Sequence, residues 1–258
     1  MIHKLTEIHP GAILGKDVNI GPFCVVDDDV VIGDGTTLIS HVHVMSGARI
    51  GKNCRIFPGA VIGAVPQDLK FVGEYTTLEL GDNNTIRECV TLNRGTASKG
   101  KTVIGSNNLI MAYCHVGHDC VLGNHIVISN DTQIAGEVTI DDWAVIGGNS
   151  AILQFSNIGK HCMISGKAGV MKDVPPYVRS AREPIQYSGI NIVGLTRRGF
   201  SQDTINTIHD CYRIIYQQNL NTTQALTKIE EEIPQCEERD EIINFIKKSK
   251  HGIIRGPK

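Results

Sequence analysis

Aliphatic residues recur at every sixth position along most of this chain. The series runs through Leu14, Ile20, Val26, Ile32, Leu38, Val44, Ile50, Ile56 and Ile62, resumes at Leu80, Ile86 and Leu92, and continues from Ile104 to Val170. A mostly small residue stands two positions before each member, and Cys24, Cys54, Cys114, Cys120 and Cys162 occupy this place. Chance would lose the phase within a few repeats, so the pattern predicts a solenoid of six-residue units.

Six-residue repeats of this kind resemble those of the left-handed parallel β-helix, in which three hexapeptides form one triangular coil of about 18 residues. The aliphatic and small positions then point inward, and the cysteines are core fillers. A glycine often follows the aliphatic residue, as at Gly15, Gly21 and Gly33, and we expect it to permit the turn. The predicted fold class is an all-β left-handed parallel β-helix over residues 1–185.

A small C-terminal α-helical domain is predicted over residues 186–258. Pro175 and Pro176 close the repeat, and the apolar spacing becomes helical from Ser201, a plausible N-cap. Further helices are predicted near 222–233 and 237–250. These helices are expected to cover the open end of the solenoid.

Two segments interrupt the repeat, at 64–77 and 93–101. Both are polar and contain glycine, and they are predicted to be loops that leave the coil. Loops on a rigid scaffold commonly carry function. A tolerated insertion explains the second loop equally well.

Composition narrows the function classes. The 258 residues carry a net charge of −2, which gives no basic surface for nucleic acid. No apolar run has the length of a signal peptide or a membrane span, so a cytoplasmic protein is expected. The eight cysteines show no CxxC spacing, which favours reduced thiols and no metal site. No cofactor is predicted.

The candidate chemistry lies between Met111 and Asp119, where His115 and His118 are three residues apart. Steps of about 18 residues from His118 reach Gly136 and Gln154, which places a base, a glycine N–H and an amide in one column. Acyl transfer needs a base for the attacking hydroxyl and a donor for the oxyanion. Asp119 is suited to holding the imidazole. The alternative is a pair of surface histidines with ordinary hydrogen bonds.

Several longer strings carry a family resemblance over nearly the whole chain. They are Gly21–Cys24, Gln67–Lys70, His115–Asp119, Asp173–Tyr177 and the segment from Asn191 to Phe200. They resemble the acyl-carrier-protein-dependent UDP-N-acetylglucosamine O-acyltransferases, which begin lipid A synthesis in Gram-negative bacteria. The resemblance implies a homotrimer with active sites in clefts between adjacent β-helices, and no metal.

The resemblance also implies residue roles. His118 would be the general base that removes the proton of the sugar 3-hydroxyl, Gly136 the oxyanion donor and Asp119 the support of the histidine. The donor would be a 3-hydroxyacyl chain on acyl carrier protein, and the acceptor UDP-N-acetylglucosamine. Substrate-binding roles are implied for Asp68, Lys70, His115, Gln154, Asn191, Arg197 and Arg198. Guanidinium groups suit phosphate recognition on their own account.

A second column contains Ala112, Asn130, Gly148 and Gly166, and its small residues predict a shallow track on the outer wall. Glycine at this position could equally serve the turn alone. The resemblance makes Gly166 the ruler of acyl-chain length, and a glycine there implies a long chain.

Three positions depart from the family pattern: Glu137, Leu153 and Val193 stand where histidine, histidine and glutamate are usual. They leave the acyl-transfer residues intact and leave open a 3-amino acceptor, which would be N-acylated. The related lipid A N-acyltransferases carry an extra N-terminal domain, whereas this repeat begins by residue 12. A γ-type carbonic anhydrase needs a third zinc histidine, which is missing at coil register. A non-enzymatic trimeric solenoid would need neither the column nor the arginine pair.

Overall fold

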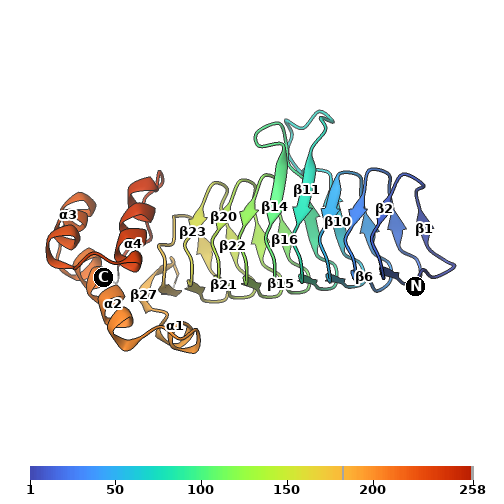
Figure 1. The fold of residues 1–258 in the computed structure, drawn as a ribbon. Helices are drawn as coiled ribbons and strands as arrows, with labels where there is room; N and C mark the ends of the chain where they lie inside the picture. The colour runs from blue at the N-terminus through green and yellow to red at the C-terminus, as the bar shows by residue number, and fades with distance from the viewer. Residues whose placement is uncertain (182, 257–258) are drawn as a thin grey trace.

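The computed structural model describes residues 1–181 and 183–256. Residue 182 of the predicted β-helix and residues 257–258 of the predicted helical domain lie outside this described part. The chain forms a left-handed parallel β-helix whose C-terminal end carries the helices (Figure 1). The fold class predicted from the hexapeptide pattern is therefore confirmed.

Short strands stack into three sheets, one on each wall of the triangular coil. The first contains β1 (Glu7–Ile8), β4 (Val25–Val26), β7 (His43–Val44), β10 (Val61–Ala64), β13 (Thr91–Asn93), β16 (His115–Val116), β19 (Gln133–Ile134), β22 (Ala151–Ile152) and β25 (Gly169–Val170). The second contains β2 (Ile13–Leu14), β5 (Val31–Ile32), β8 (Ala48–Ile50), β11 (Thr77–Leu80), β14 (Lys101–Ile104), β17 (Val121–Leu122), β20 (Thr139–Ile140) and β23 (Asn157–Ile158). The third contains β3 (Asn19–Ile20), β6 (Thr37–Leu38), β9 (Arg55–Ile56), β12 (Thr85–Ile86), β15 (Leu109–Ile110), β18 (Val127–Ile128), β21 (Val145–Ile146), β24 (Met163–Ile164), β26 (Val178–Ala181) and β27 (Gln186–Ile190).

The register of the coils follows the predicted period. His115 pairs with Gln133 and Gln133 pairs with Ala151, so each coil advances by 133 − 115 = 18 residues. The aliphatic positions from Ile20 onward fill the interior, whereas Leu14 in the first coil is half-buried. The five cysteines at the small position are all buried and free, as predicted.

The glycines after the aliphatic positions act differently from the prediction. Gly15, Gly21 and Gly33 do not adopt a left-handed φ; a Cβ on Gly21 would lie 1.7 Å from the carbonyl oxygen of Ile39 in the next coil. The left-handed residue comes two positions later, as at Phe23 with φ 61°. The expectation that these glycines permit the turn was wrong: glycine is required because successive coils approach too closely for a side chain.

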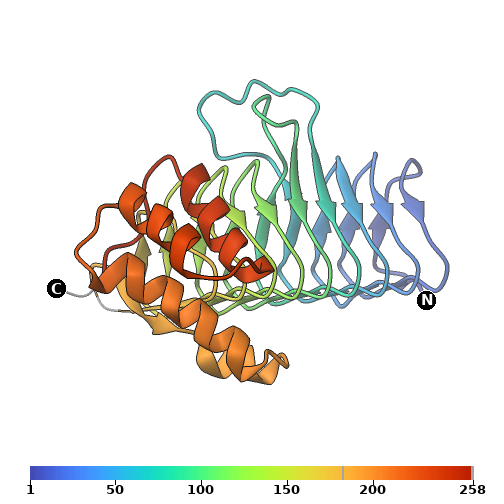
Figure 2. The same ribbon diagram turned by 60° about the vertical axis from the view of Figure 1, so that its left-hand side comes forward.

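The two predicted loops are present and lie together on one edge of the β-helix (Figures 1 and 2). The first connects β10 to β11 and the second connects β13 to β14. They contact each other, because the N–H of Ala97 donates to a carboxylate oxygen of Glu74 at 2.9 Å. The guanidinium of Arg94 also lies 5.6 Å from the centre of the Phe71 ring.

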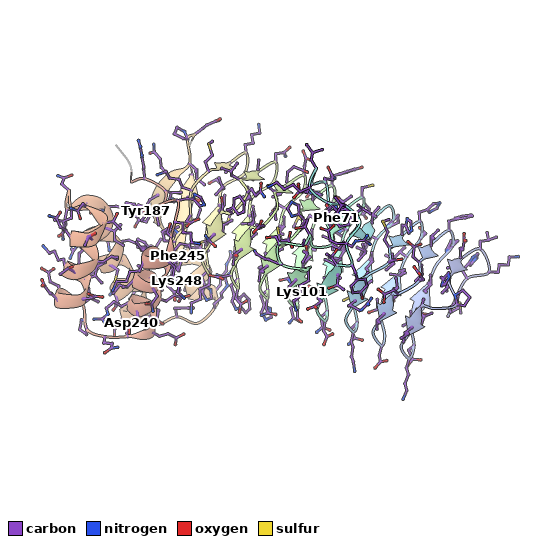
Figure 3. All side chains as sticks on the ribbon, turned by 90° about the horizontal axis from the view of Figure 1, so that it is seen from above. Phe71, Lys101, Tyr187, Asp240, Phe245 and Lys248 are labelled. Atoms are coloured by element: carbon purple, nitrogen blue, oxygen red, sulfur yellow. The ribbon has the colours of Figure 1, made fainter. Side chains whose placement is uncertain are left out.

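The C-terminal segment extends and covers the last coils. Strand β27 pairs antiparallel with β26, and this hairpin and the short helix α1 (Ile192–Arg197) are absent from the sequence prediction. Helices α2 (Gln202–Gln217), α3 (Thr222–Glu232) and α4 (Glu237–Lys248) follow close to the predicted ranges, with Ser201 as the N-cap of α2. Tyr187 of β27 stacks on Tyr216 of α2 at 4.4 Å between ring centres, where the helices meet the β-helix (Figure 3). Among the described helices, none combines the length and apolarity needed to cross a membrane.

Candidate active site

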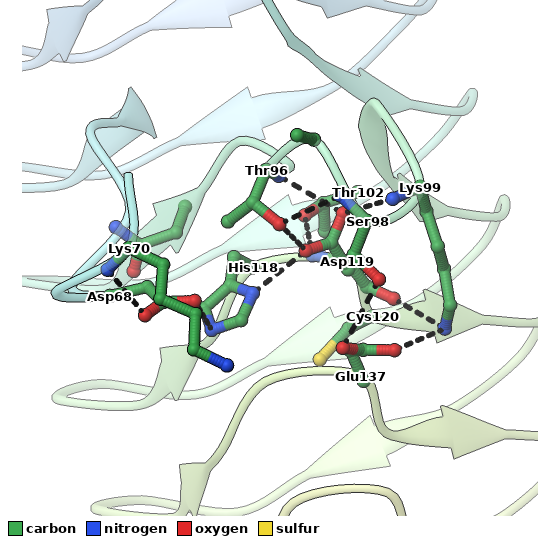
Figure 4. A network of polar contacts seen from close by, with 12 residues as sticks. Asp68, Lys70, Thr96, Ser98, Lys99, Thr102, His118, Asp119, Cys120 and Glu137 are labelled. Carbon is green, nitrogen blue, oxygen red and sulfur yellow. Dashed lines mark hydrogen bonds and ion pairs between the residues drawn. The ribbon is translucent and has the colours of Figure 1, made fainter. Parts of the chain in front are cut away.

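His118 and Asp119 form the corner between β16 of the first sheet and β17 of the second. The His118 residue is 9% exposed and Asp119 is fully buried. Asp119 takes the left-handed φ of 60° at this corner, which turns its carboxylate back towards the preceding residue. Nδ1 of His118 lies 2.8 Å from Oδ2 of Asp119 (Figure 4).

The carboxylate of Asp119 is held by the loop between β13 and β14. It accepts hydrogen bonds from the Thr96 N–H at 3.0 Å, the Thr96 hydroxyl at 2.6 Å and the Lys99 N–H at 3.2 Å. Burial opposes ionisation, but the hydrogen bonds from Thr96 and His118 hold the pKa of Asp119 below its ordinary value. An ionised carboxylate only accepts hydrogen bonds. Nδ1 of His118 therefore carries the hydrogen, and its Nε2 presents a lone pair.

Gly136 lies one coil beyond His118 and against its imidazole. A Cβ on Gly136 would be 2.5 Å from Nε2 of His118, so a side chain at this position would displace the ring. The backbone next to it is fixed, because the N–H of Glu137 donates to the carbonyl of His118 at 2.8 Å. Within the described residues, the N–H of Gly136 has no hydrogen-bond acceptor.

Gln154 continues this column in the following coil, and the N–H of its neighbour Phe155 donates to the carbonyl of Gly136 at 3.3 Å. The structure thus places His118, Gly136 and Gln154 one above another, as the register predicts.

The first loop brings Asp68 and Lys70 to the same corner (Figure 4). Oδ2 of Asp68 lies 3.9 Å from Nε2 of His118, on the side of the ring opposite Asp119. The N–H of Lys70 donates to Oδ1 of Asp68 at 2.9 Å, which fixes the carboxylate, while the Lys70 side chain remains exposed. A substrate hydroxyl placed between the imidazole and Asp68 would meet two acceptors.

His115 belongs to β16 and faces the outer wall beside His118. Its Nδ1 lies 2.7 Å from the hydroxyl of Thr91 in the preceding coil. Burial and the nearby His118 lower the pKa of His115, which favours a neutral ring. In the described part of the chain, no group of three or more His, Cys, Asp and Glu side chains is arranged to hold a metal.

Asn191, Arg197 and Arg198 lie at a different corner, between the second and third sheets. Asn191 is the N-cap of α1: its side chain accepts from the Gly194 N–H at 3.2 Å and donates to the His161 carbonyl at 2.9 Å. Arg198 donates to the Trp143 carbonyl at 3.2 Å, and its guanidinium lies 5.2 Å from the centre of the Trp143 ring. Together with the exposed Arg197 they line a cavity of about 870 Å³.

Gly166 lies at the third corner, between β24 and β25. A Cβ there would be 3.1 Å from the carbonyl oxygen of Gly148, a tight contact in an otherwise open place. A single chain therefore distributes the predicted site over three corners: His118 with Asp68, the arginine pair, and Gly166.

Sequence reasoning missed the groups that support Asp119. Thr96 and Lys99 come from the loop whose role the sequence left open, and Thr102 accepts the Asp119 N–H at 2.8 Å. The available signal was the interruption itself, since a polar segment inserted just before the His115–Asp119 coil lies beside it in space.

Comparison with known proteins supplies the family context. Residues 173–254 match the model for domain 2 of UDP-N-acetylglucosamine O-acyltransferase. Residues 29–64 and 101–136 match the bacterial transferase hexapeptide model. The acyl-[acyl-carrier-protein]–UDP-N-acetylglucosamine O-acyltransferase of Thermodesulfovibrio yellowstonii is 48% identical over 255 residues, which cover 98% of this chain and 99% of the relative.

Solved structures agree with this relationship over the full length. A UDP-N-acetylglucosamine acyltransferase from Bacteroides fragilis superposes with a TM-score of 0.98 and 53% identity, covering 99% of this chain and 100% of the other. The UDP-N-acetylglucosamine acyltransferase of Francisella novicida gives a TM-score of 0.96 and 40% identity, covering 100% and 95%.

Proposed function

Because this chain belongs to the family of acyl-[acyl-carrier-protein]–UDP-N-acetylglucosamine O-acyltransferases, we propose that His118 is the general base of the acyl transfer which this family performs. The protein is an acyltransferase that moves an acyl chain from acyl carrier protein to UDP-N-acetylglucosamine, the first step of lipid A biosynthesis. We further propose that the reaction takes place in the cytoplasm, since the acyl donor is an acyl carrier protein.

The pairing of His118 with the buried, ionised Asp119 is the observation that carries the proposal. Asp119 fixes the hydrogen on Nδ1, so Nε2 is free to take the proton of the sugar 3-hydroxyl. The oxygen then attacks the thioester carbonyl of the acyl donor. As the proton arrives, the imidazolium is stabilised by the adjacent carboxylate. Breakdown of the tetrahedral intermediate expels the thiolate of the carrier, which recovers the proton from His118.

Gly136 supplies the oxyanion donor in this proposal. Among the described residues its N–H has no acceptor, and the Gly136 backbone lies against the His118 ring, where the thioester carbonyl must come during attack. A preorganised N–H that meets the developing negative charge is worth about 10²–10³-fold in rate. Asp68 accepts a hydrogen bond from the sugar, and the sugar-binding site is lined by Lys70, His115 and Gln154.

A second copy of the chain is required to complete the site. Asn191, Arg197 and Arg198 would hold the nucleotide, yet they occupy another corner than His118, and Gly166 occupies the third. Adjacent β-helices in a homotrimer would bring different corners together across a cleft. Leu69 at the tip of the first loop is fully exposed, and Phe155 beside Gln154 is also exposed, as expected for surfaces that a neighbour covers.

Acylation of a 3-amino sugar nucleotide is the second candidate, favoured by one observation. Glu137, which follows Gly136, stands where the family usually has histidine, and its carboxylate is already engaged by the Ser98 hydroxyl at 3.3 Å. A changed environment beside the acceptor group would suit an amine in place of a hydroxyl.

The product decides between these candidates. Purified protein is offered UDP-N-acetylglucosamine or its 3-amino analogue with a chain-length series of 3-hydroxyacyl carrier proteins, and products are identified by mass spectrometry. We expect an ester at the 3-position and a preference for long chains. An amide formed only from the amino analogue would assign N-acylation, and no product from either acceptor would overturn the proposal. Sedimentation at the assay concentration tests the trimer.

A further inference from the structure

We propose that Thr96 is a positioning residue for His118, and that the 93–101 loop is a clamp that sets the geometry of base and oxyanion donor together. This inference rests on the proposed function, because it assigns the loop a part in the same reaction. It gives a role to a segment that the hexapeptide pattern marks only as an interruption.

Within the part of the chain that the structure describes, the loop supplies every donor to the Asp119 carboxylate other than His118 itself. Oδ1 accepts the N–H groups of Thr96 and Lys99, and Oδ2 is shared between the Thr96 hydroxyl at 2.6 Å and Nδ1 of His118 at 2.8 Å. Thr96 is itself buried, with 6% of the residue exposed, so these hydrogen bonds are shielded from solvent. The position of Oδ2, and with it the direction of the imidazole, is therefore set by Thr96.

The corner cannot hold an ionised aspartate without this loop. Asp119 is fully buried, and its own N–H is used by the Thr102 hydroxyl. A buried carboxylate with a single partner is strongly disfavoured and takes up a proton. Protonated Asp119 would no longer fix the tautomer of His118, so the lone pair on Nε2 would be lost for part of the population.

The same loop also reaches the coil that contains Gly136. Nζ of Lys99 donates to the Asp119 carbonyl at 3.0 Å and lies 3.9 Å from Oε2 of Glu137, and the Ser98 hydroxyl donates to Oε1 of Glu137 (Figure 4). The clamp thus bridges the coil of the base and the coil of the oxyanion donor. A shift of one relative to the other would misalign the reacting atoms, and misplacement on the 1 Å scale costs about 100-fold in rate.

The test compares two buried threonines in one scaffold. Thr96→Val removes the hydroxyl that fixes Asp119. Thr36→Val removes the hydroxyl of another buried threonine, which donates to the Gly51 carbonyl at 2.8 Å and accepts the Cys54 N–H at 3.0 Å, in a distant coil. Both variants should lose some thermal stability. We expect only Thr96→Val to lower kcat, by about 10- to 100-fold, with KM of both substrates nearly unchanged, and Thr96→Ser to restore most of the loss.

A double-mutant cycle shows whether Thr96 acts through Asp119. In an Asp119→Ala background the carboxylate is gone, so Thr96→Val should have no further effect on kcat. Equal losses in both backgrounds would overturn the positioning role. A Thr96→Val variant with the kcat of Thr36→Val would overturn it as well.

The ¹⁵N chemical shifts of the His118 ring provide a readout that does not depend on turnover. The wild-type protein should show the hydrogen on Nδ1 alone. Thr96→Val keeps the two backbone N–H donors of Oδ1 but removes the hydroxyl that donates to Oδ2, so a second tautomer of His118 should appear. A single Nδ1–H tautomer in both proteins would contradict the clamp even if the wild type is active. If the wild type shows the expected tautomer but no acyl transfer, the proposed function is wrong. The inference that Thr96 positions the His118 ring is then still supported.

Discussion

His118 and His161 lie at different corners of the same β-helix, and they differ in what surrounds the ring. His118 stands next to a buried carboxylate and presents Nε2 to a space bounded by Asp68 and Gly136. His161, at the corner between the second and third sheets, is stacked between Trp143 and Tyr177 at 6.3 and 5.7 Å between ring centres. The scaffold is the same at both corners, so the neighbours decide which ring is suited to chemistry.

Among the described residues, no carboxylate forms an ion pair or hydrogen bond with the His161 ring. Its Nδ1 is buried and has no hydrogen-bond partner among the described residues. Burial, with the positive charges of Arg198 and Lys160, lowers the pKa of His161 to about 4, although Asp142 opposes this. A neutral ring packed among aromatic rings stabilises the junction with the C-terminal segment. A general base of the kind proposed for His118 needs a hydrogen fixed on one ring nitrogen, and a carboxylate that could fix it adjoins His118 but not His161.

Replacing the His118 ring should have the largest effect. His118→Ala removes the proposed base from a corner whose backbone is held by the Glu137 N–H, so the fold should persist. We expect kcat to fall by about 10²–10⁴-fold, measured as thioester consumption with acyl carrier protein. The His161→Phe variant is the matched control, since it removes a ring from the other corner. Activity of His118→Ala within a few-fold of wild type, with an unchanged melting curve, would refute the assignment.

His161 should instead affect how the free energy of unfolding depends on pH. The folded-state pKa of about 4 lies below the ordinary value of 6.5, so the unfolded chain binds a proton that the folded protein refuses. The contribution of the neutral His161 ring to the free energy of unfolding is fully present above pH 6.5. It is lost as the pH falls towards 4, and the loss amounts to about 3 kcal/mol.

Denaturant unfolding of wild type and His161→Phe across this pH range isolates the effect. Phenylalanine is accepted at this kind of corner, because Phe155 adopts the same left-handed φ in this chain. Only the difference between the two proteins is diagnostic, since burial raises the pKa of nearby Asp141 to about 6 and thereby opposes the loss in both. Parallel stability curves for the two proteins would show that His161 is not held neutral.

The hexapeptide period predicts much of the fold and part of the candidate site. It predicts the coil register, and a register of 18 residues is enough to place Gly136 and Gln154 above His118. The period cannot describe the segments that leave it. Thr96 contacts Asp119 from a loop 23 residues earlier, a contact that depends on how the loop folds back.

The glycines illustrate another limit of the sequence. The pattern marks Gly21 correctly, but the physical cause is the close approach of Ile39 in the next coil, which no local propensity reveals. The same applies to Asn191: the family resemblance implies a role in nucleotide binding, whereas the contacts of its side chain in the structure are those of a helix cap. Distances between coils and between segments are tertiary facts, and the repeat fixes them only where it is unbroken.

Substituting Arg197 and Arg198 one at a time should separate the proposed binding of the nucleotide from the structural support of the His161 corner. Arg197 is exposed beside the cavity, whereas Arg198 is bonded to the Trp143 carbonyl. Arg197→Ala should raise KM for UDP-N-acetylglucosamine about tenfold with kcat nearly unchanged, as expected for loss of uniform binding. Arg198→Ala should raise this KM and also lower the melting temperature. A rise in KM for the acyl carrier protein alone would assign the pair to the carrier, which is acidic.

Substitution of Gly166 should have the smallest and most specific effect on activity, because Gly166 lies at a different corner from both His118 and His161. A methionine side chain would extend over the track formed by Ala112, Asn130 and Gly148, and its Cβ fits if the Gly148 carbonyl yields slightly from 3.1 Å. Each methylene denied burial costs about 0.8 kcal/mol, or roughly fourfold in kcat/KM. Gly166→Met should therefore shift the optimum of a chain-length series of acyl carrier proteins to shorter chains, while kcat with the best short donor is retained. Gly169→Met, at an exposed position of β25 where a Cβ meets no atom within 4 Å and φ is not left-handed, controls for adding a methionine. An unchanged optimum in a folded Gly166→Met protein would leave Gly166 as a residue of the turn, and the acyl chain would have to lie along another wall.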